Sequence, residues 1–121
     1  MEDRIVNELV IMRLQPGENL MERLVEAGRK YGVRLGVVVS GLGTTRKVRL
    51  GYFRSPGNYD TRTFEGVHEL LALSGGLRLE GNELKPHLHA TVSGPDLQAW
   101  GGHLLELEAA VMVEVVLRKI E

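Results

Sequence analysis

The pattern of hydrophobic and polar positions divides the chain into one helical segment and a series of strand-like segments. Apolar residues recur at three- and four-residue steps from Leu20 to Tyr31, with charged residues between them. This spacing predicts an amphipathic helix over residues 20–32. Asn19 is placed to cap its first turn, and Gly32 is placed to end it.

The other apolar segments are rich in Val, Ile and Leu, and turns containing Gly, Asn and Pro separate them. They predict strands over 4–14, 33–43, 46–53, 61–66, 68–81, 86–92 and 104–120. The last segment begins with LELEAA, which suits a helix, but its β-branched VMVEVVL part favours a buried strand. A hairpin or connecting turn is expected at 40–45 and a loop at 54–60. The predicted fold class is therefore α+β, a mainly antiparallel sheet with one main helix packed on it, in a single domain over 1–121.

Composition narrows the class of protein. The chain has 121 residues, of which 43% are hydrophobic and 26% charged, as in an ordinary globular domain. The absence of cysteine excludes disulfides and thiolate chemistry. No apolar run approaches the roughly 20 residues of a membrane span, and the first residues lack the features of a signal peptide. We therefore expect a cytoplasmic protein without a membrane partner.

Three of the four histidines lie within residues 85–104, KPHLHATVSGPDLQAWGGHL. His87 and His89 share one face of the predicted strand, because side chains alternate along a strand. SGPD predicts a turn after it, so a returning strand brings His103 beside the first two. Three imidazoles can bind zinc or another divalent transition metal at about 2.0–2.1 Å. Such a site keeps one open coordination position, as catalytic zinc sites do.

A second interpretation treats the same histidines as structural residues that hydrogen-bond near a turn, with Asp96 and Glu106 as candidate partners. The remaining histidine, His68, is expected to be an exposed or half-buried strand residue. No Ser–His–Asp order, carboxylate pair or nucleophile motif indicates another catalytic site.

The glycine-rich segment at 40–45, SGLGTT, lacks the patterns of a P-loop or a dinucleotide-binding turn. The alternative to a simple turn there is an anion nest of backbone N–H groups, assisted by Arg46 and Lys47. With Arg49 these residues form the one basic cluster that suits an anion or nucleic acid. The net charge of −1 argues against the chain gripping DNA by itself.

From about Arg13 to Leu117 the chain resembles the plant-and-prokaryote-conserved (PPC) domain family, in its free-standing prokaryotic type. The similarity lies in RLQPGENLMERLVEAGRKYGVRLGVVVSGLGTTRKVRLGYF, GVHELLALSGGL and PHLHATVSGPDLQAWGGHLL, with PHLHA and GGHL the most specific parts. The family's histidines are matched in full, at His87, His89 and His103. The resemblance implies an α+β fold and a homotrimer.

In plant relatives this domain follows AT-hooks that bind DNA, while the domain itself assembles trimers and recruits regulatory protein partners. This chain lacks the AT-hook core Arg-Gly-Arg-Pro, so the resemblance does not carry direct DNA binding over to it. The plant partner-recruiting hexapeptide, GRFEIL, falls on residues 66–71. Gly66, Glu69 and Leu71 match it, Leu70 is close, and the second and third positions differ.

Two glycines and a tryptophan precede the third histidine. Gly101 and Gly102 allow positive φ or a close backbone approach just before His103. Trp100 is expected to pack at the rim of a pocket or a subunit contact.

Three functions follow as hypotheses. We favour a homotrimeric binding and assembly module with a metal or small-ligand site at the histidines. The alternative is a metal-dependent hydrolase or lyase in which Glu106 or Asp96 serves as general base. The third is a DNA-associated regulator that contacts phosphates through its basic cluster of Arg46, Lys47 and Arg49.

Overall fold

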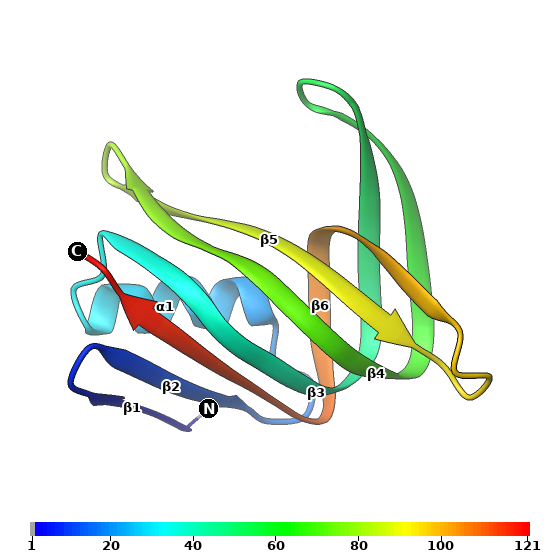
Figure 1. Cartoon of the computed structure of the whole chain (residues 1–121), viewed down its shortest axis with the longest axis horizontal. Coiled ribbons are helices and arrows are strands. Elements are labelled where there is room, and N and C mark those ends of the chain that lie inside the picture. Colours follow the sequence, from blue (N-terminus) through cyan, green and yellow to red (C-terminus); the bar gives the residue numbers. More distant parts are fainter. Residues whose placement is uncertain (1) are drawn as a thin grey trace.

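Antiparallel pairing of a few long strands produces the fold, which a computed structural model describes for residues 2–121 (Figure 1). The elements in chain order are β1 (Glu2–Val6), β2 (Leu9–Leu14), α1 (Leu20–Lys30), β3 (Leu35–Ser55), β4 (Asn58–Glu80), β5 (Glu83–Ser93) and β6 (Ala99–Lys119). The strand order is β1-β2-β6-β3-β4-β5, and β5 also pairs with β6. The second pairing closes β6, β3, β4 and β5 into a ring, so the sheet curls strongly.

The expected mainly antiparallel sheet with one helix is confirmed, and because the helix has only 11 residues the fold is mostly β. The Asn19 side chain accepts a hydrogen bond from the Glu22 N–H at 3.2 Å, as an N-cap should. Gly32 follows the helix with a φ of 64°, and its N–H donates to the Arg29 carbonyl at 3.2 Å. Across residues 2–121, no helix has the length and apolar character that a membrane-spanning helix needs.

Glycines bend strands in this fold where the sequence pattern predicts that they end them. The segment 40–45 is not a turn but lies inside β3, which joins the two strands expected at 33–43 and 46–53. Gly43 has a φ of 144°, and a Cβ there would collide with the Met112 carbonyl oxygen of β6. The expected turn and the anion-nest alternative are therefore wrong, because pairing with β4 and β6 occupies the backbone.

Three other boundaries also differ from the prediction. The strands expected at 61–66 and 68–81 are one strand, β4, which passes through Gly66 at a φ of 81° and ends at Glu80. The expected loop at 54–60 is mostly strand, and its reversal is confined to the short turn between β3 and β4. Conversely, the expected strand at 4–14 is a hairpin of β1 and β2, because Asn7 turns the chain with a φ of 54°.

The core lies between α1 and one face of the sheet. Leu20, Leu24 and Ala27 of the helix are fully buried there. Gly28 comes so close to the sheet that a Cβ would lie 3.0 Å from the Leu84 side chain. The opposite face is not covered by a helix and carries an apolar sheet patch. This patch consists of four residues that are 46–60% exposed: Val37, Val39, Leu42 and Leu71.

The first prediction concerns Gly75, which has a φ of 116° and lies directly against the His87 carbonyl oxygen of the neighbouring strand. Gly75→Ala should lower the free energy of unfolding by about 3 kcal/mol or more, because it combines backbone strain with a collision. Gly57→Ala is the matched control, since Gly57 also has positive φ but faces open space. It should lose only about 1 kcal/mol. Urea denaturation followed by tryptophan fluorescence measures both, and equal losses would contradict the assignment.

Candidate functional site

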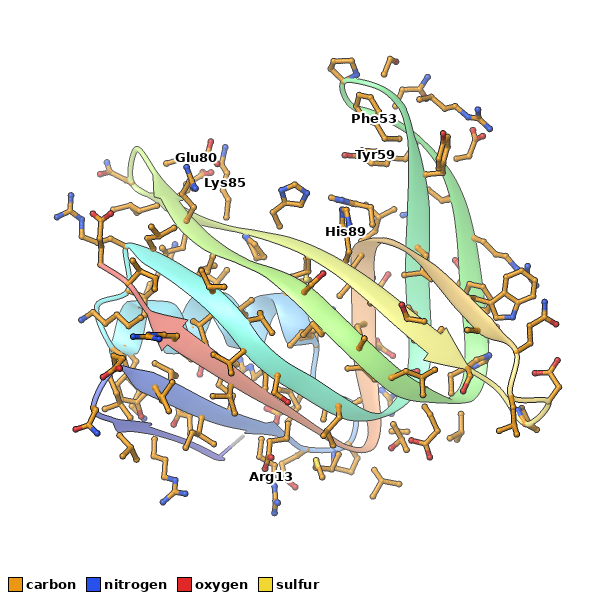
Figure 2. The ribbon with its side chains drawn as sticks, in the orientation of Figure 1. Arg13, Phe53, Tyr59, Glu80, Lys85 and His89 are labelled. Atoms are coloured by element: carbon orange, nitrogen blue, oxygen red, sulfur yellow. The ribbon has the colours of Figure 1, made fainter. Side chains whose placement is uncertain are left out.

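Pairing between β5 and β6 brings three histidines to one face of the sheet. His89 lies directly opposite His103 in the antiparallel register, and His87 is two residues earlier on β5. The ring centroids are 5.2–5.6 Å apart, and one nitrogen from each ring lies within 4.8 Å of the others. Figure 2 shows His89 projecting from the sheet beneath the long β3–β4 hairpin. The expected return of His103 beside the other two is confirmed.

The chain reverses between the two strands through a short turn. The Leu97 N–H donates to the Gly94 carbonyl at 3.0 Å, and the Asp96 carboxylate accepts the Gln98 N–H at 3.0 Å. These bonds let the chain return within five residues. The SGPD prediction of a turn is therefore confirmed, and Asp96 belongs to that turn.

Backbone contact explains the glycine before the third histidine. A Cβ at Gly102 would lie only 2.9 Å from the Gly51 carbonyl oxygen, so β6 and β3 approach closely there. The expected close approach is confirmed. The alternative expectation, positive φ at Gly101 and Gly102, is wrong, because both have negative or extended φ values.

The three rings differ in their exposure to solvent. His87 and His89 are exposed, whereas His103 is half-buried. Burial lowers the pKa of His103 below its usual range, and the neighbouring His87 and His89 lower it further when they are charged. Neutral imidazole is the form that binds metals. His103 is therefore held in its ligand form near neutral pH.

Within the described part of the chain, none of these three rings takes part in a hydrogen bond. His68 differs, because its Nδ1 lies 3.0 Å from the Gly66 carbonyl oxygen. The structural interpretation required partners such as Asp96 and Glu106. Asp96 is engaged in its turn, and Glu106 forms an ion pair with Lys47 at 3.4 Å. Neither carboxylate joins the histidine cluster. The rings therefore remain available to bind something else.

The geometry suits one metal ion. Nitrogens bound to a tetrahedral zinc at about 2.0–2.1 Å lie about 3.4 Å from one another. The ligand nitrogens here lie up to 4.8 Å apart, so the exposed rings of His87 and His89 would have to turn inward to hold one ion. Three protein ligands leave one position for water or a small ligand.

Two hollows lie along β4 and β5 near the cluster. A hollow of about 460 Å³ includes His87, Val37 and Lys85 in its wall, and another of about 170 Å³ includes His89 and Ser74. Each hollow therefore includes one of the two exposed histidines, and neither includes His103.

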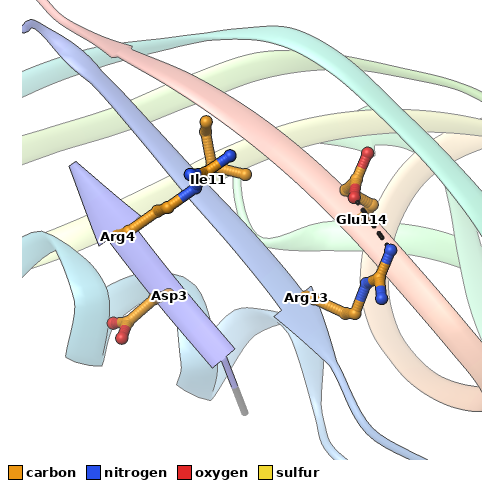
Figure 3. Close-up of a pocket in the computed structure, with 5 residues that line it drawn as sticks. All are labelled: Asp3, Arg4, Ile11, Arg13 and Glu114. Carbon is orange, nitrogen blue, oxygen red and sulfur yellow. Dashed lines mark ion pairs between the residues drawn. The ribbon is translucent and has the colours of Figure 1, made fainter. Parts of the chain in front are cut away.

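A separate hollow of about 260 Å³ lies over β1, β2 and β6 (Figure 3). Its lining residues are Asp3, Arg4, Ile11, Arg13 and Glu114, of which Arg13 and Glu114 form an ion pair at 3.5 Å. Figure 2 places Arg13 at the far edge of the sheet from His89. This hollow is therefore not part of the histidine site.

The basic cluster does not form a free cationic surface. Arg46 pairs with Glu108 at 3.2 Å, and Lys47 pairs with Glu106 at 3.4 Å, so β6 supplies an acidic partner to each. Arg49 is exposed and donates at 3.5 Å to a threonine hydroxyl. Acidic side chains thus neutralise two of the three positive charges expected to contact phosphate.

The four partner-binding candidates lie along β4. Leu70 is buried in the core, while Glu69 and Leu71 are exposed, and Gly66 marks the bend. Leu70 is therefore inaccessible to a partner. His68 is half-buried, as expected, and contacts the Phe64 ring edge-on.

Trp100 and Tyr59 occupy different aromatic environments. Trp100 packs within the chain, with its ring 5.8 Å from that of Phe64 and the Arg62 guanidinium over it at 4.3 Å. Tyr59 stacks on His103, with centroids 4.8 Å apart and planes inclined by 25°. Sequence reasoning missed Tyr59 because RSPGNYD was interpreted as a loop. The Pro-Gly pair between aromatic residues is the signal for a hairpin there.

The chain is similar to proteins that carry several different names. Over 93 residues it is 34% identical to a Synechococcus sp. (strain JA-2-3B'a(2-13)) protein named bifunctional protein GlmU. That match covers 77% of this chain, and the chain spans only 14% of the relative's length.

Two crystal structures share the fold. One is a candidate DNA-binding protein from Bacteroides thetaiotaomicron, with a TM-score of 0.91 and 23% identity over 99% of this chain and 84% of that one. The other is a metal-containing protein from Archaeoglobus fulgidus, with a TM-score of 0.81 and 23% identity over 94% and 81% of the two chains. A family model provides the broader match, since it aligns with residues 2–121. The chain therefore belongs to the Plants and Prokaryotes Conserved (PCC) domain family, the family abbreviated above as PPC.

Proposed function

We propose that this chain is a metal-binding assembly module, a homotrimer in which each histidine cluster holds one divalent transition metal and a small ligand. The observation that carries the proposal is the convergence of three ligand nitrogens, from two strands, within 4.8 Å. The metal-containing relative from A. fulgidus supports it. Imidazole ligands suit zinc, which is the metal we expect first.

The assembly part of the proposal rests on the family and on the uncovered sheet face. In the apolar sheet patch, Val39 is 60% exposed, Leu42 is 50% exposed and Leu71 is 52% exposed. Large contiguous apolar surfaces on a protein are typical of interaction sites. A second copy of the chain is the partner that the family resemblance implies.

Binding is favoured over catalysis by the surroundings of the cluster. A metal-dependent hydrolase or lyase needs a group that moves a proton beside the open position. Glu106 is paired with Lys47, and Asp96 is held in the turn after β5. The two carboxylates suggested for that role are thus engaged elsewhere.

A DNA-associated role is the second candidate, because a structural relative is described as a candidate DNA-binding protein. In this chain the net charge is −1, and Arg46 and Lys47 are paired with carboxylates. Direct phosphate contact would need those cations to be free. We infer that any association with DNA passes through protein partners.

Metal binding is tested by titrating the protein with Zn²⁺ in a calorimeter. We expect about one ion per chain, and His89→Ala should weaken binding by about 100-fold or more, since a lost ligand costs at least as much as a lost outer-shell partner. His68→Ala is the matched control, because His68 lies outside the cluster. This variant should bind Zn²⁺ as tightly as the parent does. A triple variant of His87, His89 and His103 that retains the parent's affinity would refute the metal site.

Assembly is tested by light scattering. The parent should have three times the mass of one chain at micromolar concentration. Replacing Leu42 and Leu71 together by Asp should yield a monomer, because burying two carboxylates in an apolar contact is strongly unfavourable. Leu97→Asp is the control, since Leu97 is 84% exposed on the turn and outside the apolar sheet patch. A monomeric parent would end the trimer proposal.

Direct DNA contact is tested by gel retardation of an AT-rich duplex at about 50 mM salt, where phosphate contacts are strong. We expect no retardation by the protein alone. If the duplex is retarded, and Arg49→Ala abolishes the retardation, then the chain binds DNA itself and the indirect role is wrong.

A further inference from the structure

The β3–β4 hairpin extends beyond the rest of the sheet as an arm, residues 52–61. The last pair between β3 and β6 is Gly51 with His103, so past that point β3 pairs only with β4. Figure 1 shows the arm rising away from the other strands. Two-stranded hairpins are marginally stable without further packing. Any contact between the aromatic residues of the arm and the rest of the sheet therefore stabilises the arm.

One such contact joins the arm to the histidine cluster. The Tyr59 ring stacks on the His103 ring at 4.8 Å, and Phe53 contacts Tyr59 edge-on at 5.9 Å. Gly51 makes room for this arrangement, because a Cβ there would lie 3.2 Å from Tyr59 Cδ1. The half-buried histidine is thus covered by an aromatic ring that comes from the arm.

The hydroxyl of that tyrosine is unused by the rest of the described chain. None of the hydrogen bonds formed among residues 2–121 involves the Tyr59 hydroxyl. Figure 2 shows the side chain extending from the arm toward the space over His89. A hydrogen-bond donor therefore extends from the arm on the side of the sheet where the histidine cluster lies.

The charge balance of the cluster indicates what that donor binds. Among the described residues, the group with metal-ligand spacing comprises three histidines and no carboxylate. Neutral imidazoles leave the full charge of a divalent ion uncompensated, which favours an anion as the fourth ligand. A phenol hydroxyl near that ligand donates best to an anionic oxygen.

We propose that Tyr59 completes the candidate metal centre: its ring positions His103, and its hydroxyl donates a hydrogen bond to a small oxyanion held at the metal's open position. This inference rests on the proposed metal site. It assigns a ligand class, a small oxyanion for which acetate is the probe, and makes the arm part of the binding site.

The test uses the full chain loaded with Co²⁺, whose visible spectrum reports its ligands, and acetate as the probe. Co²⁺ affinity is measured first, then acetate affinity. Tyr59→Phe should bind Co²⁺ as the parent does but bind acetate about tenfold more weakly, since one hydrogen bond to a charged group is lost. Tyr52→Phe is the matched control on the same arm and should match the parent in both measurements.

Two further variants separate the ring from the hydroxyl. Tyr59→Leu should lower Co²⁺ affinity about three- to tenfold, because His103 loses its stacking partner, and Phe at that position should restore it. Gly51→Ala keeps the hydroxyl but pushes the ring aside, so it should weaken acetate binding without removing any donor. Circular dichroism confirms that each variant is folded.

Each outcome decides between the two proposals. A parent that binds no Co²⁺ overturns the metal site and this inference with it. A parent that binds Co²⁺ while Tyr59→Phe binds acetate equally well overturns only the role of the hydroxyl. Loss of Co²⁺ itself in Tyr59→Phe would also overturn it, because the oxygen would then be a metal ligand.

Discussion

The antiparallel pair between His89 of β5 and His103 of β6 is the contact on which the candidate site depends. β5 pairs with β4 along almost its whole length, and only residues 89–93 also reach β6. The pair forms only because the sheet curls until its edge strand meets a strand from its middle. An open, flatter sheet made from the same strands would separate His103 from the other two histidines.

Curvature in turn depends on long strands that bend without breaking. Gly43, Gly66 and Gly75 all have positive φ, which ordinary side chains rarely adopt within a strand. Two of these glycines also lie where a neighbouring backbone approaches too closely for a Cβ. Bends of this kind are a general way to close a sheet on itself. They let β3 and β4 pair with the body and still continue into the arm.

Local patterns predicted the features that local chemistry determines. The helix, its cap at Asn19 and the shared face of His87 and His89 follow from spacing within a few residues. The continuity of β3 could not be predicted in this way, because a glycine-rich segment between apolar runs favours a turn. Only pairing with β4 and β6 shows that its backbone groups are already bonded. The contact of Tyr59 with His103 is equally non-local.

Charge pairing explains why the histidines, rather than the basic cluster, are the chemically available part of the molecule. The carboxylates of β6 face Arg46 and Lys47, a result of register that spacing along one strand does not reveal. His103 is held between a strand pair and an aromatic ring, while its two partners are exposed. Because His103 is already ordered, it would lower the entropy cost of binding a metal. The exposed His87 and His89 would supply the side-chain movement that binding needs. In the proposed metal site, this combination would let nitrogens up to 4.8 Å apart converge on one ion.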